Sequence, residues 1–179
     1  ANAEIDDRLI KLLESLGLPQ DFKPVRVRPT LCAPYGDDLS ELGFNKVEWA
    51  PYIWQGDIPL PKDHKLLAEN RVFAIGLASV LTCLQLTLRP GDKVLDMCAA
   101  PGIKSLYLQI LHKKKLELYV NDISNERLIR LRTLFEQFEM PLPTFSHQPG
   151  QTLHMRYKPH YFDAVIIDAP CSSEGNALT

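Results

Sequence analysis

Hydrophobic positions in this 179-residue chain follow a helical spacing near its start and form short buried runs further on. Apolar residues recur every three to four positions over residues 4–16, which predicts an amphipathic helix ended by Gly17. Three short elements are expected after it: an extended piece at 24–30, a helical turn at 37–42 and a strand at 47–54. The region is rich in proline and turns, and it predicts a small α+β subdomain over residues 1–65.

Strands and helices alternate in the remainder of the chain. Apolar periodicity predicts a long lead-in helix over residues 66–88, before Pro90 and Gly91. The elements expected next are strands at 93–97, 116–121, 144–147 and 163–167, and helices at 104–111 and 125–138. The strand at 163–167 is apolar on both faces, which is typical of the middle of a parallel sheet. Residues 66–179 therefore predict a doubly wound α/β sheet preceded by the small subdomain.

The last expected strand lies close to the end of the sequence. If residues 163–167 closed the sheet, an apolar parallel strand would form an open edge, which is a template for aggregation. We therefore expect the sheet to be incomplete on its C-terminal side and the polypeptide to continue beyond Thr179, although a partner chain could supply the edge instead. Because the sequence begins with Ala1 rather than Met, we expect that its true start is either missing or has been processed.

Composition excludes several classes of protein. The chain is 45% hydrophobic and 23% charged, as globular domains are, and no apolar run reaches the length of a membrane span. A net charge of −2 does not by itself indicate a nucleic-acid binder, and the basic run at 113–115 suits the end of a helix. The four cysteines lack the spacing of a disulfide framework or a zinc site. We expect reduced thiols in an intracellular protein without a metal, in the cytoplasm, nucleus or mitochondrion.

Three aromatic side chains in the first region admit two interpretations. Trp49, Tyr52 and Trp54 could stack on nucleic-acid bases, because every base presents a flat face to an aromatic ring. Aromatic residues in such a pattern more often fill a hydrophobic core. We expect these three to be core residues.

A loop of small residues joins the first strand of the α/β region to its helix. Residues 98–102 read Cys-Ala-Ala-Pro-Gly, and small side chains let backbone N–H groups approach a ligand closely. The glycine patterns of dinucleotide sites and phosphate-binding loops are absent. Asp122 ends the next strand, where an acid accepts hydrogen bonds from ribose hydroxyls. An adenosyl ligand without phosphates, such as S-adenosylmethionine, is favoured; alternatively Asp122 caps the following helix, beside Ser124.

A second motif follows the strand at 163–167. Residues 168–172 read Asp-Ala-Pro-Cys-Ser and lie where open α/β sheets bind ligands. A thiolate such as that of Cys171 can add to C6 of cytosine, which makes C5 nucleophilic enough to take a methyl group. Asp168 could bind the N3 and N4 edge of a flipped base. The alternative is that Cys171 is a buried structural cysteine.

The two motifs together resemble the NOL1/NOP2/Sun family of RNA cytosine-C5 methyltransferases. They are CAAPGIKS at 98–105 and DAPCSSEG at 168–175. The order of VRVRPT at 25–30, Trp49 and a helix leading into PGDKVLD is also similar to this family. The resemblance implies a Rossmann-like methyltransferase sheet, S-adenosylmethionine as the cofactor, and rRNA or tRNA as the substrate. A ribosomal particle or a protein would be a further partner.

The resemblance also implies roles for individual residues. Those implied to bind the cofactor are Cys98, Ala99, Ala100, Pro101, Gly102, Ile103, Lys104, Asp122, Arg127 and Asp168. Asp168 would in addition lie next to the target base, and Cys171 would be an auxiliary cysteine that assists product release. The cysteine that attacks C6 would be a later one, which this chain does not contain.

Several positions depart from the family pattern. Ile103 and Ser173 replace residues that are usually glycine or another small residue, and Ile75-Gly76 replaces a pair formed by glutamine and an acid. The segment 148–150 lacks an acid expected near the adenine amino group. These departures keep open a second class of function, an RNA- or ribosome-binding protein that transfers no methyl group. A methyltransferase for another nucleophile is a third possibility, although Asp-Ala-Pro-Cys differs from the Asn-Pro-Pro-Tyr motif of amino-group enzymes.

Overall fold

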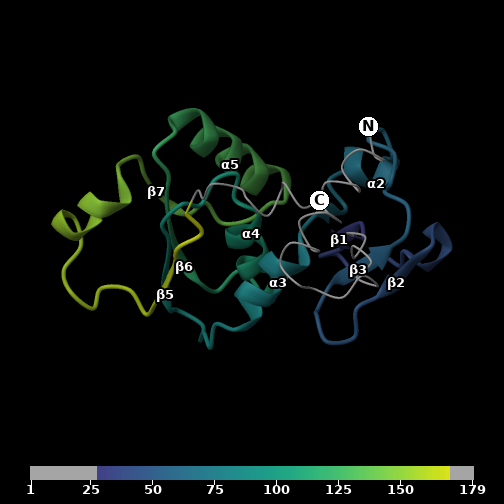
Figure 1. Ribbon diagram of the computed structural model, residues 1–179, viewed down its shortest axis with the longest axis horizontal. Helices are drawn as coiled ribbons and strands as arrows, with labels where there is room; N and C mark the ends of the chain where they lie inside the picture. The colour runs from purple at the N-terminus through teal and green to yellow at the C-terminus, as the bar shows by residue number, and fades with distance from the viewer. Residues whose placement is uncertain (1–27, 170–179) are drawn as a thin grey trace, which may run out of the picture. The chain divides into compact units, whose positions relative to one another are not determined.

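The computed structural model describes residues 28–169, which form one compact unit. Two four-stranded sheets make up this unit: an antiparallel one in the order β2-β3-β1-β4 and a parallel one in the order β7-β6-β5-β8 (Figure 1). The helix expected at 4–16 and most of the extended piece at 24–30 lie outside the described residues, as does everything after Ala169. The predicted α/β class with a parallel sheet is confirmed.

The antiparallel sheet is built from short elements. They are β1 (Thr30–Cys32), the 3-10 helix η1 (Ser40–Leu42), β2 (Phe44–Lys46), β3 (Ile53–Gly56), α2 (Lys65–Ala68) and β4 (Phe73–Ala74). The helical turn expected at 37–42 is confirmed as η1. The strand expected at 47–54 is wrong, because a turn occupies most of this range: Val47 N–H donates to Ile53 O at 2.8 Å and Tyr52 has a φ of 65°.

The long helix expected at 66–88 is also wrong. The range holds the short α2, then β4, then α3 (Leu77–Leu84). Asn70 has a φ of 54°, a left-handed conformation that commonly ends helices. The chain beyond it pairs with β1, as the 3.1 Å bond from Ile75 N–H to Thr30 O shows. Pairing with a distant strand thus overrides the helical spacing of these residues. The division of the chain at residue 65 stays a prediction, although β4 follows it and belongs to the antiparallel sheet.

The parallel sheet follows the expected alternation. Its elements are β5 (Lys93–Asp96), α4 (Ile103–Leu111), β6 (Glu117–Asn121), α5 (Asn125–Gln137), β7 (Thr144–Ser146), the 3-10 helix η2 (Gly150–Met155) and β8 (Ala164–Ile166). Helices α4 and α5 cover one face of the sheet, and the segment at 150–162 lies on the other (Figure 1). The basic run at 113–115 follows the end of α4, as predicted. Among the described residues, no helix has the length and apolar character needed to cross a membrane.

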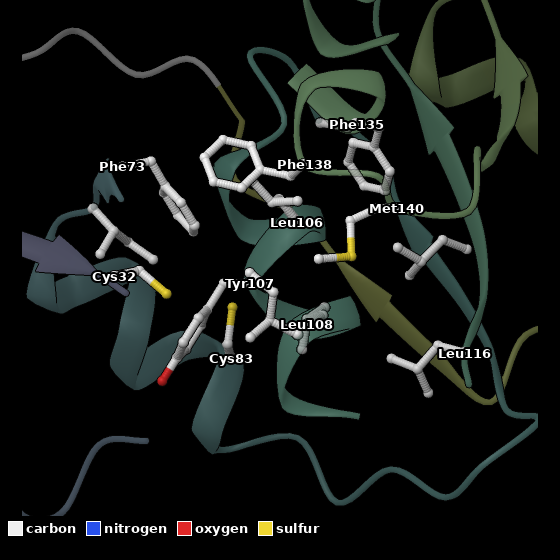
Figure 2. Close-up of a cluster of buried hydrophobic side chains, with 14 of the residues drawn as sticks. Cys32, Phe73, Cys83, Leu106, Tyr107, Leu108, Leu116, Phe135, Phe138 and Met140 are labelled. Carbon is white, nitrogen blue, oxygen red and sulfur yellow. The ribbon is translucent and has the colours of Figure 1, made fainter. Parts of the chain in front are cut away.

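One hydrophobic core is shared by the two sheets. Helix α4 contributes Leu106 and Tyr107, and the end of α5 contributes Phe138 (Figure 2). Phe73 of β4 meets Phe138 edge to face, with ring centroids 5.1 Å apart. The Tyr107 hydroxyl donates to Pro51 O at 3.0 Å, which satisfies the polar end of a fully buried ring. The antiparallel sheet is therefore packed directly against the helices of the parallel one.

The three aromatic residues singled out in the sequence separate in the structure. Tyr52 packs against the shared core, and Trp54 packs against a smaller apolar cluster within the antiparallel sheet. For these two the core interpretation is confirmed. Trp49 lies in the turn before β3 and its side chain is 54% exposed, so the core interpretation is wrong for Trp49.

Candidate functional site

The predicted cofactor loop is attached to the end of β6. Ala99 N–H donates to the backbone oxygen of Asn121 at 2.9 Å, and Ala100 N–H donates to Asp122 Oδ2 at 3.3 Å. The Arg127 guanidinium donates to Ala100 O and lies 3.4 Å from Asp122 Oδ2. The structure therefore brings together the loop, Asp122 and Arg127, which the sequence grouped by motif alone.

Gly102 lets the loop turn tightly into α4. Its φ is 102°, a left-handed conformation that L side chains rarely adopt. A Cβ atom at this position would lie 2.5 Å from Leu131 Cγ on α5, far inside van der Waals contact. Glycine here therefore allows both the turn and the close approach of the two helices.

Lys104 and Asp168 form an ion pair across the sheet's switch point. The chain leaves β5 toward β6 on one side and returns to β8 on the other, and ligands of open α/β sheets bind where the strand order reverses in this way. Lys104 Nζ lies 2.5 Å from Asp168 Oδ2. The lysine side chain is 19% exposed and the aspartate 60% exposed, so the carboxylate can reach a bound molecule. The pair joins the cofactor motif to the acid of the second motif.

Asp122 is buried and already holds two backbone groups. Besides the Ala100 N–H, its carboxylate accepts Ser124 N–H at 2.9 Å, and only 3% of the residue is exposed. The N-cap of α5 is Ser124, whose hydroxyl oxygen accepts Arg127 N–H at 3.4 Å. The alternative in which Asp122 itself is the N-cap is therefore wrong. Ribose binding by Asp122 stays a prediction.

Asp96 is a member of this cluster that the sequence did not single out. Its carboxyl is 1% exposed, Oδ2 accepts the Ser105 hydroxyl at 2.8 Å, and Oδ1 has no hydrogen-bond partner. Burial raises its pKa to about 6; the Ser105 bond and the Lys104 charge act in the opposite direction. The signal in the sequence was an acid ending an otherwise apolar strand, Val-Leu-Asp, since such an acid is carried into the interior.

Each of the two motifs contains one cysteine, and the structure describes the one in the cofactor loop, Cys98. Cys98 is half-buried, and burial followed by the negative charges of Asp122 and Asp96 raises the pKa of its thiol. A raised pKa lowers the fraction of thiolate at neutral pH, which makes the Cys98 thiol less nucleophilic than that of a free cysteine. Cys171 lies outside the described residues, as does Ser173.

The remaining loop residues face α5. Pro101 and Ile103 line a shallow groove together with Arg130, Thr133, Leu134 and Gln137. The side chain of Ile103 also packs against the shared core. The structure thus gives this departure from the family pattern a packing role.

The segment after β7 reaches the same end of the sheet. His147 Nε2 lies 2.9 Å from Ile123 O, and a Cβ atom on Gly150 would lie 2.8 Å from Met97 Sδ. Ile123 follows Asp122 and is 69% exposed. The segment 148–150, which lacks the acid expected near the adenine amino group, therefore lies beside the cofactor loop. Within the described part of the chain, no group of His, Cys, Asp and Glu side chains is arranged to hold a metal ion.

Comparisons with known proteins agree with this architecture. A family model described as 16S rRNA methyltransferase RsmB/F matches residues 83–177, just over half of the chain. The 26S rRNA (cytosine-C(5))-methyltransferase nsun-1 of Caenorhabditis elegans is 27% identical over 92% of this chain and 26% of its own length. A mitochondrial tRNA (cytosine(34)-C(5))-methyltransferase of Mus musculus is 35% identical over 64% of this chain and 34% of its own.

A solved structure shares the fold. The methyltransferase homolog protein from Pyrococcus horikoshii gives a TM-score of 0.71 over 95% of this chain and 65% of its own, at 21% identity. The chain spans about a quarter of the length of nsun-1 and a third of that of the mitochondrial enzyme. The resemblance seen in the two motifs is confirmed, and the chain belongs to the RsmB/F methyltransferase family.

Proposed function

We propose that this chain forms the cofactor-binding part of an RNA cytosine-C5 methyltransferase, which transfers a methyl group from S-adenosylmethionine to a cytosine of rRNA or tRNA. The observation that carries the proposal is the Lys104–Asp168 ion pair, because it joins the small-residue loop to a reachable carboxylate at the switch point. The names of the curated relatives describe cytosine-C5 methyltransferases of rRNA and of tRNA, which supports the same substrate class.

The residues at the strand ends fit an adenosyl cofactor. The Asp122 carboxylate offers about four lone-pair positions, and the two N–H groups of Ala100 and Ser124 leave capacity for ribose hydroxyls. Exposed Ile123 beside it offers an apolar surface on which a flat adenine ring can lie. When bound, S-adenosylmethionine would supply an electrophilic methyl group. The absence of a phosphate-binding loop is consistent with a cofactor that carries no phosphates.

Lys104 and Asp168 would prepare the site for the base. Lys104 donates to Asp168 Oδ2, which orients the carboxylate, and Oδ1 would accept a hydrogen bond from a cytosine amino group. The attack on C6 would come from a cysteine outside this chain, with Cys171 as its helper. RNA as the substrate supports an intracellular location, as do Cys32, Cys83 and Cys98, which are free thiols in the described part of the chain.

Titration calorimetry with S-adenosylmethionine and S-adenosylhomocysteine tests the cofactor assignment. We expect binding by the wild-type chain and an affinity lowered about tenfold or more in Asp122→Asn, because a charged acceptor of the ribose hydroxyls is lost. The matched control is Asp163→Asn. Asp163 also accepts a backbone N–H, that of Lys93 at 2.8 Å, but at the opposite end of the sheet.

Two results would count against the proposal. Lack of wild-type binding at millimolar cofactor would favour the alternative of an RNA- or ribosome-binding protein without methyl transfer. Equal losses in Asp122→Asn and Asp163→Asn would mean that the effect is a general loss of stability. Transfer of a labelled methyl group to rRNA or tRNA by the full polypeptide then tests the reaction itself.

A further inference from the structure

Asn121 is a buried amide where three strand ends meet. It is the last residue of β6, between β5 and β7, and 1% of it is exposed. Its Nδ2 donates to Met97 O at 3.0 Å and to Gln148 O at 2.9 Å. Its Oδ1 accepts the Ser146 hydroxyl at 2.9 Å. Both donor hydrogens of the amide are therefore used, and its oxygen is bonded as well.

These bonds begin where the strand ladders end. The last residue of β5 paired with β6 is Asp96, and the last residue of β7 paired with β6 is Ser146. The carbonyl groups of Met97 and Gln148 lie beyond these pairs, and a buried carbonyl without a partner costs stability. One side-chain amide supplies a donor to each. The amide of Asn121 thereby extends the attachment of β6 to both neighbours past the regular sheet.

The two attached segments form the sides of the proposed cofactor site. Met97 leads directly into the loop at 98–102, and Gln148 belongs to the segment that follows β7. The backbone oxygen of Asn121 also accepts Ala99 N–H at 2.9 Å, so the loop is held at two points. Asp122, the next residue, accepts Ala100 N–H with its carboxylate at 3.3 Å and donates its own N–H to Ser146 O, at the end of β7, at 3.4 Å. Because Asn121 precedes Asp122 directly, the same hydrogen bonds that hold the loop and the segment after β7 also fix where the Asp122 carboxylate lies.

We propose that Asn121 is a positioning residue for the cofactor: it holds the loop at 97–102 and the segment at 147–150 at the separation that the adenosyl group requires. This inference rests on the proposed function for the identity of the ligand. The attachment of the two segments is a property of the ligand-free fold and can be measured without a cofactor.

Replacement of Asn121 by aspartate reverses the hydrogen bonding with little change in size. A carboxylate facing the carbonyl oxygens of Met97 and Gln148 repels both, so we expect S-adenosylhomocysteine to bind about tenfold or more weakly at pH 7.5. Asn121→Leu removes the donors without adding charge and should weaken binding to a similar extent. Ser146→Ala removes the bond to Oδ1, together with the 3.3 Å bond from the same hydroxyl to Val120 O, and leaves both Nδ2 bonds in place. We expect an intermediate loss.

The control is Gln109, a second buried amide. Its Nε2 donates to Leu116 O at 3.0 Å and its Oε1 accepts Leu116 N–H at 3.3 Å, before the start of β6 and at the other end of the sheet. Gln109→Glu should lower stability and leave affinity for S-adenosylhomocysteine within about twofold of wild type. A loss of affinity through general destabilisation would appear equally in both variants.

A pH profile separates positioning from packing. As the pH falls toward 5, the aspartate of Asn121→Asp takes up a proton and its O–H can donate to one of the two carbonyls. The affinity of this variant relative to wild type should therefore recover at least threefold, whereas Asn121→Leu should show no recovery. Asp96, Asp122, Arg127 and His147 are the titratable groups near the position, and they are present in wild type and in both variants. Asn121→Leu therefore serves as the comparison that adds no charge.

Hydrogen exchange of the ligand-free protein completes the test. We expect faster amide exchange at 97–102 and 147–150 in Asn121→Asp and in Ser146→Ala, and wild-type exchange there in Gln109→Glu. Unchanged exchange in the first two variants would overturn the attachment. Faster exchange with wild-type affinity for S-adenosylhomocysteine would overturn the role in cofactor positioning. If wild type binds no cofactor, the proposed function fails, and exchange alone decides whether Asn121 holds the segments.

Discussion

At the scale of single residues, Asp96 is the most buried acid of the site, with 1% of the residue exposed. Its carboxyl is buried at the end of β5 with one oxygen unbonded, and its pKa is raised from 3.8 to about 6. Burial disfavours the charged form, and the negative charges of Asp168 and Asp122 act in the same direction. The Ser105 hydroxyl and Lys104 limit the shift. The folded protein therefore binds a proton here more tightly than the unfolded chain does.

The resulting pH dependence of stability has a definite sign. Below pH 3.8 Asp96 is neutral in both states; between 3.8 and 6 the unfolded chain releases its proton first, so stability falls as the pH rises. A shift of two units corresponds to about 3 kcal/mol, lost above pH 6. Urea unfolding measures the free energy of unfolding of wild type and of Asp96→Asn across this pH range. The value for wild type minus that for the variant should fall by about 3 kcal/mol between pH 3.8 and pH 6. A flat difference, or one that rises with pH, would show that Lys104 keeps Asp96 ionised in the folded protein.

At the scale of elements, the sequence predicts a strand or helix correctly where the apolar spacing of that segment matches the face it buries in the core. Strands β5, β6 and β8 and helices α4 and α5 are apolar where they face the core, so their spacing alone locates them. The predicted lead-in helix is wrong because residues 73–75 pair with β1, more than 40 positions earlier, which no local pattern reveals. For a similar reason, the sequence pattern does not single out Asp96 and Asn121. Their importance lies in contacts with segments that are distant in sequence.

The contact between α4 and α5 depends on the absence of a side chain at Gly102. We expect Gly102→Ala to lower the free energy of unfolding by about 3 kcal/mol, because a left-handed backbone and a clash with Leu131 both penalise the new methyl group. Thermal or urea unfolding measures this loss. Gly36→Ala is the control for the backbone penalty alone, since Gly36 has a φ of 81° and no atom within 4 Å of the added carbon. Its expected cost is about 1 kcal/mol.

A double-mutant cycle separates the two contributions. Shortening Leu131 to alanine removes the atoms nearest the new carbon, so Gly102→Ala should cost about 2 kcal/mol less in that background than in wild type. Additive effects of the two substitutions would contradict a steric origin. In that case the backbone conformation alone would explain the cost, and the close approach of α4 and α5 would not depend on Gly102.

At the scale of the whole described unit, a shared core joins two sheets that the sequence places in separate domains. Cys32 and Phe73 of the antiparallel sheet lie in one cluster with Leu106, Tyr107 and Phe138 (Figure 2). The hydroxyl of Tyr35 also donates to Phe138 O at 3.2 Å, across 103 positions of sequence. A core that is continuous across the two sheets favours a single cooperative unfolding transition over two independent ones.

Native-state hydrogen exchange distinguishes these two cases. If the described residues unfold as one unit, the slowest amides of β3 and of β6 should exchange with the same free energy of opening. Phe44 is the informative position, because it is buried in the smaller cluster confined to the antiparallel sheet, with Leu31 and Leu39. Under cooperative unfolding, Phe44→Ala should lower both opening free energies by about 4 kcal/mol, although β6 contributes no residue to the smaller cluster. A decrease in β3 alone would show that the antiparallel sheet opens independently, as expected of a subdomain that ends near residue 65.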